Sequence, residues 1–241
     1  MIEIIPVGGL PEVREGDDLG ALIAGGAELR ESDVVVVAQK VVSKAEGRVV
    51  RLEGVEPSRD AVELAGPETD LRQLEVILSE TARVVRSRNG LVIAETRHGF
   101  VCASAGVDHS NTAEPDTVIL LPLDPDASAR RIRKAIRAAG VDVAVIVADS
   151  FGRPFRKGTT DVAIGVAGFA PLRDLRGTPD RAGKALRSTQ IAVADELAAA
   201  ANLVRASKAD GIPVVIVRGA NTRGDGTAVE LVIPPDRDLF R

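Results

Sequence analysis

Four consecutive valines, Val34 to Val37, are the feature that most constrains the fold of this 241-residue chain. A strand with one wet face alternates apolar and polar residues, and this run does not alternate. It therefore predicts a fully buried strand over Asp33 to Ala38. Val141 to Ala148 and Val214 to Val217 predict two more core strands. Combined with helical segments, these strands indicate an α/β fold of the mixed α+β kind.

The remaining elements follow from apolar spacing, capping residues and turn signals. Helices are predicted over 17–24, 68–88, 125–139 and 188–206. Shorter strands are predicted over 2–6, 91–95, 100–104 and 117–121, with a further edge over 231–233. We expect a single domain spanning residues 1–241, in which residues 55–90 form a helical insertion.

Composition excludes several classes of function. Aromatic residues make up 2% of the chain, so platforms for stacking single-stranded nucleic acid are nearly absent. The net charge of -4 leaves no basic footprint for nucleic acid or anionic lipid. The single cysteine, Cys102, rules out an internal disulfide and a cysteine zinc cluster. No signal peptide or membrane-spanning apolar run is visible, and we expect a cytoplasmic protein.

Two nucleotide-binding motifs fail inspection. The segment GTPDRAGK, Gly177 to Lys184, resembles a P-loop, but it has five residues between its glycines where four are required. Ala185 stands where a Ser or Thr would bind magnesium. No GxGxxG follows a predicted strand, so a Rossmann fingerprint is absent as well.

Two polar clusters follow predicted strands. The loop GVDHSN, Gly106 to Asn111, offers Asp108 and other oxygen ligands of the kind that Mg²⁺ or Mn²⁺ prefers. An Asx-type turn is the alternative, and composition alone favours it. In VIVADSFGRPFRKG, Val145 to Gly158, a buried strand leads into Asp149 and Ser150, and strand ends are where α/β sheets hold ligands.

Basic residues follow two of the predicted buried strands. Arg153, Arg156 and Lys157 follow Asp149, and a carboxylate beside cations suits a metal and a phosphate group. Lys40 and Lys44 follow the valine strand. They are either phosphate contacts or solvated lysines on an edge hairpin, with nothing in the sequence to separate the two.

The motifs resemble one family along about residues 2 to 220. In order, IPVGGLP, GDDL, VVSKAEGR, ETRHGFVCASAGVDHSN, LPLDPDASA, DSFGRPFRKGTTDVAIGVAG, VADELAAAANLV and DGIPVVIVRG are similar to the coenzyme F420-0:L-glutamate ligase family. The resemblance implies a two-subdomain fold without a P-loop and an intertwined homodimer. Actinobacterial members carry a second, flavin-reductase-like domain, for which we expect no counterpart here.

The resemblance also implies site residues. The nucleotide-contacting positions match Leu10, Pro11, Glu12, Val13, Gln39, Lys40, Lys44 and Asn111. The metal positions match Asp108, Asp149 and Ser150, for two divalent ions, Mg²⁺ or Mn²⁺, with K⁺ as a further candidate. Gln39 and Lys40 depart from the small hydroxyl residues of archaeal relatives. Ser207 stands where those relatives are expected to have an acidic ligand for the second metal.

The implied activity is ligation of L-glutamate to coenzyme F420-0 with GTP, and γ-linked addition of further glutamates. We expect an acyl-phosphate intermediate, with Asp149, Lys44 and Arg153 as catalytic residues. Arg97, Arg153, Arg173 and Arg187 are candidates for holding the deazaflavin phosphodiester. An amide ligase with another carboxylate substrate and a non-catalytic GTP-binding module remain alternatives.

Overall fold

The computed structural model describes residues 1–110, 114–205, 211–222 and 224–239. Its strands are β1 (Glu3–Val7), β2 (Val34–Ala38), β3 (Val49–Arg51), β4 (Thr81–Arg88), β5 (Leu91–Thr96), β6 (Val101–Ala103), β7 (Thr117–Ile119), β8 (Ala144–Arg153), β9 (Arg156–Ala167), β10 (Leu172–Asp174), β11 (Gln190–Ala192) and β12 (Val214–Arg218). Its α-helices are α1 (Leu19–Gly26), α2 (Gln39–Ala45), α3 (Arg59–Leu64), α4 (Leu71–Ser79), α5 (Pro125–Ala138) and α6 (Val193–Asn202), and η1 (Ser104–Gly106) and η2 (Ala228–Leu231) are 3₁₀ turns. This mixture confirms the predicted fold class.

The valine strand lies at the centre of a five-stranded sheet with the order β1-β12-β2-β8-β9. Strands β2 and β8 are parallel, and the other pairs are antiparallel. All four side chains from Val34 to Val37 have no exposed area. The prediction of a fully buried strand is confirmed, and β8 and β12 confirm the other two core strands.

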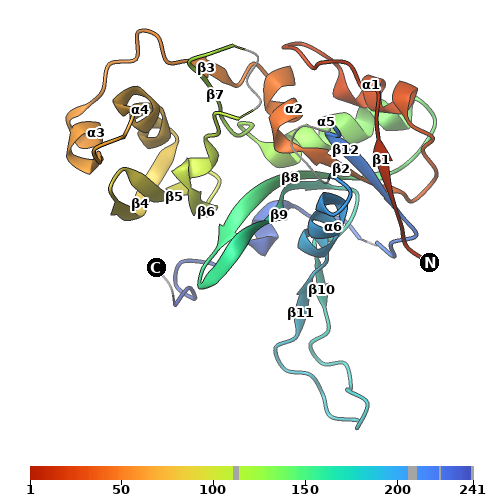
Figure 1. The fold of residues 1–241 in the computed structure, drawn as a ribbon. Helices are drawn as coiled ribbons and strands as arrows, with labels where there is room; N and C mark the ends of the chain where they lie inside the picture. The colour runs from red at the N-terminus through yellow and green to blue at the C-terminus, as the bar shows by residue number, and fades with distance from the viewer. Residues whose placement is uncertain (111–113, 206–210, 223, 240–241) are drawn as a thin grey trace.

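Both faces of this sheet are covered, which explains why the valines do not alternate with polar residues. Val35 and Val37 pack into a core cluster with α1, α2 and α5, whereas Val34 and Val36 pack into a second cluster with α6. Figure 1 shows α1, α2 and α5 above the sheet and α6 below it. Strand residues of odd and even number therefore face different helices.

Strand β8 runs well past the end of its parallel neighbour. The pairing of β2 with β8 stops at Ala38 and Ala148, but β8 continues to Arg153 as one arm of a long hairpin with β9. The prediction that the strand ends before Asp149 is wrong, because β9 supplies an antiparallel partner beyond that point. A bulge near the base of the hairpin leaves Ile164 extra, since Val147 pairs with Gly165 and Ala148 with Ala163.

A second lobe lies between α2 and α5 in the chain and has its own core. Strands β4, β5 and β6 form a sheet there, and β3 pairs with β7. Their core includes Leu52, Leu74, Ile77 and Val92, separate from the clusters of the large sheet. Figure 1 shows this lobe, with α3 and α4, at one side of the molecule.

The predicted helix over 68–88 is partly wrong. Helix α4 ends at Ser79, and Thr81–Arg88 forms strand β4 against β5. The sequence contains the reason, since Val84 and Val85 are β-branched and favour a strand. The helical spacing of the leucines stops at Leu78, so residues 55–90 are not wholly helical.

Other helix boundaries follow local chemistry. Asp18 caps α1 by accepting a hydrogen bond from the Ala21 N–H, and Asp124 caps α5 in the same way through the Ala127 N–H. Pro125 occupies the first turn of α5, where a missing N–H is harmless. The helices predicted over 17–24 and 125–139 are confirmed.

Two predictions in the C-terminal part need correction. The helix expected over 188–206 begins only at Val193, because residues 190–192 pair with β10 as β11. The edge strand expected over 231–233 does not form, since η2 ends at Leu231 and residues 232–233 belong to no strand. The P-loop-like segment from Gly177, rejected on its spacing, lies in the arm between β10 and β11 that projects from the body (Figure 1), so a strand and not a helix comes next after it.

Within the described ranges, no helix is both long enough and apolar enough to cross a membrane.

Candidate functional site at the N-terminus of α2

Helix α2 begins directly where β2 ends, so Lys40 and Lys44 stand on a helix. The edge hairpin considered from the sequence is wrong. Ala38 is the last strand residue and also the residue before the first helical turn. Four residues apart on a helix, Lys40 and Lys44 occupy the same side of α2. Val42 is buried on the other side and packs into the core of the large sheet.

Lys40 brings the second lobe to this helix. Its Nζ lies 2.7 Å from Asp108 Oδ2 and donates to Ser110 Oγ at 2.9 Å. The Asp108 backbone is fixed by two hydrogen bonds with Ile119 of β7, at 3.0 and 2.7 Å. Asp108 Oδ1 also accepts the Ser110 N–H at 2.6 Å, which is the Asx turn considered from the sequence. The same carboxylate thus makes the turn and faces the helix.

The two candidate metal-binding carboxylates have opposite electrostatic surroundings. Burial disfavours the charged form of Asp108, but the hydrogen bonds from Lys40 and from Ser110 outweigh it and lower the pKa to about 2. Burial raises the pKa of Asp149 to about 7, and the charges of Asp108 and Asp161 add to this, against the hydrogen bond from the Ser150 N–H and the charge of Lys40. Asp149 thus belongs to the same charged group as Lys40 and Asp108.

Asp149 and Ser150 face opposite sides of the β8–β9 hairpin. Asp149 lies two residues after Val147, which faces α2, so its side chain is on the α2 side. Burial raises the pKa of the Cys102 thiol to about 12, and the charge of Asp149 contributes to this shift. Ser150 follows Ala148, which faces α6, and its hydroxyl donates to Asp161 Oδ1 at 2.5 Å. Neighbouring strand residues point to opposite faces, so Ser150 and Asp161 lie on the face opposite to Asp149, although the charge of Asp161 still acts on Asp149.

Asp161 and Arg205 are polar residues at this site that sequence analysis missed. Asp161 is 3% exposed and pairs with Arg205, whose Nη1 lies 2.5 Å from Asp161 Oδ2. A lone carboxylate opening the run DVAIGVAG was the available signal, since buried carboxylates require partners. For Arg205 no sequence signal existed, because its partner is 44 residues away.

The predicted nucleotide-contacting residues fall into two kinds. Lys44 is 14% exposed at its side chain and forms an ion pair with the exposed Glu12, with 2.6 Å between Nζ and Oε1. Leu10 and Val13, in contrast, pack against the core of the large sheet. Val13 is buried and Leu10 is half-buried, whereas Pro11 and Glu12 between them are exposed.

The side chain of Gln39 is buried and makes hydrogen bonds within the protein. Its side chain is 1% exposed, and its Nε2 donates to Ser43 Oγ at 2.8 Å and to the Leu120 carbonyl at 2.9 Å. It therefore ties the start of α2 to the segment after β7. Asn111 and Ser207 lie outside the residues that the structure describes.

Arg153 is not brought next to Asp149. It pairs with Arg156 at the tip of the β8–β9 hairpin, where Phe155 has φ 60, and its Nη2 donates to the Lys157 carbonyl at 2.9 Å. Four strand residues correspond to about 13 Å. The three cations from Arg153 to Lys157 thus lie at the tip, and Lys40 of α2 is a cation whose charge acts on Asp149.

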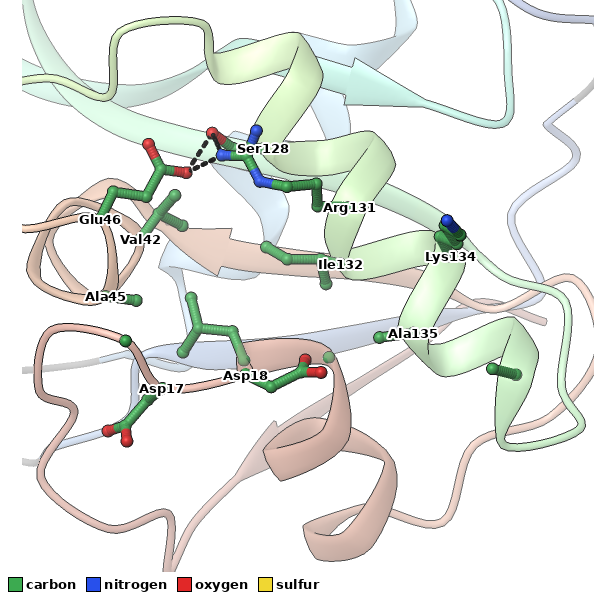
Figure 2. A pocket seen from close by; sticks show the side chains of 14 residues that line it. Asp17, Asp18, Val42, Ala45, Glu46, Ser128, Arg131, Ile132, Lys134 and Ala135 are labelled. Atoms are coloured by element: carbon green, nitrogen blue, oxygen red, sulfur yellow. Dashed lines mark hydrogen bonds and ion pairs between the residues drawn. The ribbon is translucent and has the colours of Figure 1, made fainter.

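A cavity of about 470 Å³ lies on another side of α2 and is distinct from this site. Figure 2 shows it between α2, α5 and the start of α1, with Glu46 accepting hydrogen bonds from Ser128 and Arg131. Val42, Leu19 and Ile132 contribute apolar surface. Neither Lys40 nor Lys44 lines it, so the cavity does not join the cationic side of the helix.

Comparison with known proteins agrees with the order of motifs along the chain. The family model described as F420-0:Gamma-glutamyl ligase matches residues 9–219. The chain is 43% identical over 252 residues to the coenzyme F420:L-glutamate ligase of Methanothermobacter thermautotrophicus, covering 100% of this chain and 99% of the relative. It is 47% identical over 247 residues to the protein of the same name from Methanopyrus kandleri, covering 100% of this chain and 98% of the relative. The chain belongs to the F420-0:gamma-glutamyl ligase family.

Proposed function

We propose that this protein joins L-glutamate to coenzyme F420-0 in coenzyme F420 biosynthesis, with GTP as the energy source, and adds further glutamates through γ-linked amides. Two full-length relatives that are 43% and 47% identical carry the name coenzyme F420:L-glutamate ligase. The observation that carries the proposal is the grouping of Lys40, Asp108 and Asp149 where α2, the second lobe and the β8–β9 hairpin meet. Cations beside carboxylates suit phosphate transfer with a metal.

The donor set fits a hard divalent cation. Asp108 and Asp149 offer carboxylate oxygens, which Mg²⁺ and Mn²⁺ prefer, and burial raises the pKa of Asp149, so a bound cation would favour its charged form. No three His, Cys, Asp or Glu side chains of the described residues converge on a single point. Magnesium sites on substrate phosphates use one or two carboxylates and water. Asp108, Asp149 and Ser150 would hold such ions, which supply charge neutralisation at the γ-phosphate.

The proposed reaction needs no covalent bond to the enzyme. A carboxylate oxygen of F420-0 forms a bond to the γ-phosphorus of GTP, while the bond from that phosphorus to the β–γ bridging oxygen breaks and GDP leaves. The glutamate amine then attacks the acyl carbon, inorganic phosphate leaves, and the amine loses a proton to solvent. Lys40 and Lys44 hold phosphate oxygens during transfer, as point charges on one side of α2.

We assign Arg153 a role further from the transferred phosphate. Its position at the hairpin tip, about 13 Å along the strand from Asp149, suits the phosphodiester side chain of the deazaflavin. A guanidinium binds phosphate oxygens through two parallel hydrogen bonds, which would orient the long substrate along the hairpin. Monovalent K⁺ and a homodimer complete the proposed active form.

The first experiment is incubation of the purified protein with F420-0, L-glutamate, GTP and Mn²⁺, followed by mass spectrometry of the deazaflavin and measurement of phosphate release. A product heavier by one or more glutamyl residues, with one GDP per glutamate, is expected. Reactions without glutamate and with ATP replacing GTP are the controls. GTP binding without any glutamylated product would overturn the proposal, and a product from another carboxylate acceptor would change its substrate.

A further inference from the structure

The tip of the β8–β9 hairpin carries an exposed aromatic side chain. Pro154 and Phe155 form the two-residue connection between the strands, since Arg153 pairs with Arg156. Phe155 is 91% exposed, whereas Phe169 is fully buried. Figure 1 shows the hairpin reaching beyond the sheet to the edge of the molecule. In a chain with five Phe and no Trp or Tyr, a ring in solvent is an unusual use of a scarce side chain.

The backbone of Phe155 adopts a conformation that its side chain disfavours. Its φ of 60 lies in the left-handed region, where the Cβ of an L-residue crowds the following carbonyl oxygen. Turns that need this conformation usually place Gly or Asn there, as Asn89 does with φ 50 between β4 and β5. Phe155 thus weakens the turn at a position where its ring gains little from burial. A contact outside the folded body accounts for a phenylalanine here.

Basic residues surround the exposed ring. Arg153, Arg156 and Lys157 lie within two residues of Phe155, and all three are exposed. The segment 150–160 contains no acidic residue. The tip therefore combines one aromatic face with three positive charges. This combination is complementary to a planar aromatic ligand that carries negative charge, because rings stack on rings and guanidinium groups bind phosphate oxygens.

The tip is continuous with the candidate site. Strand β8 runs from Ala144 through Asp149 to Arg153 and leads directly into the turn that holds Phe155. A long substrate whose reacting carboxylate lies beside Asp149 can therefore extend along the hairpin to its tip. In F420-0 the phosphodiester lies between that carboxylate and the deazaflavin ring. The same order, from reacting end to ring, is that of Asp149, Arg153 and Phe155 along the hairpin.

We propose that Phe155 is a substrate-binding residue whose ring stacks on the deazaflavin ring of F420-0, with Arg156 and Lys157 facing the negative charge of this ligand. The inference rests on the proposed function, in which F420-0 is the substrate that receives glutamate. It assigns the aromatic end of the substrate to the hairpin tip, whereas the reacting end lies near the N-terminus of α2.

The test is calorimetric binding of F420-0 to the full-length protein without GTP or glutamate, which separates this contact from turnover. Phe155→Ala is expected to weaken F420-0 binding by about 10-fold or more, the usual loss when an aromatic stacking partner is removed. Phe155→Trp keeps a stacking face and is expected to stay within about threefold of wild type. In turnover, Phe155→Ala should raise KM for F420-0 and preserve kcat, because the ring lies away from the reacting atoms. Wild-type affinity in Phe155→Ala would overturn the proposal.

Phe155→Gly separates loss of the ring from damage to the fold. Glycine adopts a positive φ without strain, so this variant is expected to unfold at the same temperature as wild type or at a higher one. It also lacks the ring and is expected to weaken F420-0 binding as much as Phe155→Ala does. Weaker binding in Phe155→Ala alone would assign the effect to the backbone of the turn and overturn the proposal.

Leu91 provides a matched control at the turn of another hairpin. It is 56% exposed and begins β5 directly after the turn that joins this strand to β4. Leu91→Ala also removes exposed apolar surface, and it is expected to leave F420-0 affinity within about twofold of wild type, as a distant independent site should. An equal loss in Leu91→Ala would show that the effect is not specific to the tip and overturn the proposal.

Two further measurements test other occupants of the tip. Light scattering of Phe155→Ala is expected to give the wild-type mass, and the wild type is expected not to sediment with vesicles of anionic phospholipid. A lower mass would place the tip in an interface between two copies of the chain, and vesicle binding that Phe155→Ala loses would assign it to a membrane surface. Either result would overturn the proposal.

The outcomes also separate this inference from the proposed function. If the wild type binds F420-0 through Phe155 yet makes no glutamylated product, the proposed function fails while the role of Phe155 stands. If glutamylated product forms and Phe155→Ala keeps the wild-type KM for F420-0, the proposed function stands while the role of Phe155 fails.

Discussion

Asp108 and Asp149 are chemically identical side chains that their neighbours make different. Lys40 and the Ser110 N–H hold Asp108 in its charged form against burial, while burial and two neighbouring carboxylates favour the protonated form of Asp149. The difference sets opposite effects on stability, because a carboxyl with a raised pKa binds more protons in the folded protein than in the unfolded chain.

The pKa of Asp149 predicts a pH dependence of folding in metal-free protein. Between about pH 4, where an unfolded aspartate titrates, and about pH 7, the folded protein holds the extra proton. The free energy of unfolding is therefore expected to fall as pH rises through this window. Urea unfolding in EDTA at several pH values measures it. The Asp149→Asn variant should show a smaller slope, and an unchanged slope would remove Asp149 as the cause. Asp108 acts separately, with stability lost only as pH falls from about 4 toward 2.

Loss of the Asp149 charge is expected to remove activity without unfolding the protein. Asp149→Asn preserves the shape of a side chain whose charged form is already disfavoured by burial, so the melting temperature should not fall. The rate of glutamyl product formation should drop by about 100-fold or more, the usual effect of losing a group that stabilises developing charge. Mass spectrometry and a thermal melt measure the two quantities on the same sample. Near-normal turnover would exclude Asp149 from the metal site.

Variants of Lys44 and Glu12 can distinguish the effect of the Lys44 charge on GTP binding from the effect of the Lys44–Glu12 ion pair. Their ion pair has one exposed partner, and such pairs contribute about 0–1 kcal/mol to stability. Lys44→Met is expected to weaken GTP binding by about 10- to 100-fold in calorimetry, because a charged phosphate contact is lost. Glu12→Gln breaks the same ion pair but leaves the cation, and it should preserve or improve GTP affinity. Equal losses in both variants would mean that the ion pair, and not the Lys44 charge, matters.

At the scale of elements, the β8–β9 hairpin is held in place by hydrogen bonds between residues far apart in the sequence, which the sequence pattern does not predict. Asp126, in the first turn of α5, accepts the Val166 N–H at 2.7 Å and the Ala228 N–H at 2.9 Å, which links α5, β9 and η2. Asp195 accepts the Ala163 N–H beside the bulge. The hairpin therefore carries Asp149 and Ser150 on a rigid base.

Gly165 is predicted to be essential for this base. A Cβ at that position would lie 2.2 Å from the Pro125 carbonyl oxygen, a backbone atom that cannot move aside without shifting α5. Gly165→Ala is expected to lower the free energy of unfolding by about 3 kcal/mol, the upper range for overpacking. Gly152→Ala is the matched control, since a Cβ there meets nothing within 4 Å, and its effect should stay within about 0.5 kcal/mol. Chemical denaturation of both variants measures the difference, and similar values would contradict the predicted clash.

At the scale of the whole molecule, the candidate site lies where two lobes meet. Lys40 and Gln39 belong to the helix that follows the large sheet, and they contact Asp108 and the Leu120 carbonyl of the second lobe. Arg48 adds a hydrogen bond to the Leu121 carbonyl at 2.9 Å. Metal or nucleotide binding at this junction would therefore also fix the relation between the lobes.

The exposed β10–β11 arm leads us to predict that the protein forms a dimer. Its outer part, residues 176–185, is exposed along its whole length and projects from the body (Figure 1). Such a ribbon is stable only weakly by itself, and a second copy of the chain would cover it. Light scattering is expected to give twice the chain mass of 25.2 kDa. Replacing residues 176–187 by Asn-Gly should shift the protein toward the monomer, and an unchanged mass would exclude the arm from the interface.

The sequence by itself determined the parts that depend on local pattern. Val34 to Val37 could be placed in a doubly covered core strand because burial on both faces leaves no polar alternation. The helix that begins near Asp18 could be placed because a capping carboxylate acts within three residues of itself. The order of motifs also identified the family, since long and unusual sequence stretches can be recognised without knowing which residues they contact.

Only the tertiary structure decided which polar groups meet. Asp108 could not be separated from a plain Asx turn, because the turn is real and its ion pair with Lys40 joins residues far apart in the chain. Asp161 could not be found as the partner of Ser150, because the register of the hairpin depends on a bulge and on pairing beyond the end of β2. Pattern reports which face of an element is apolar, whereas contact between distant side chains depends on how the elements pack, and that is set by the whole chain at once.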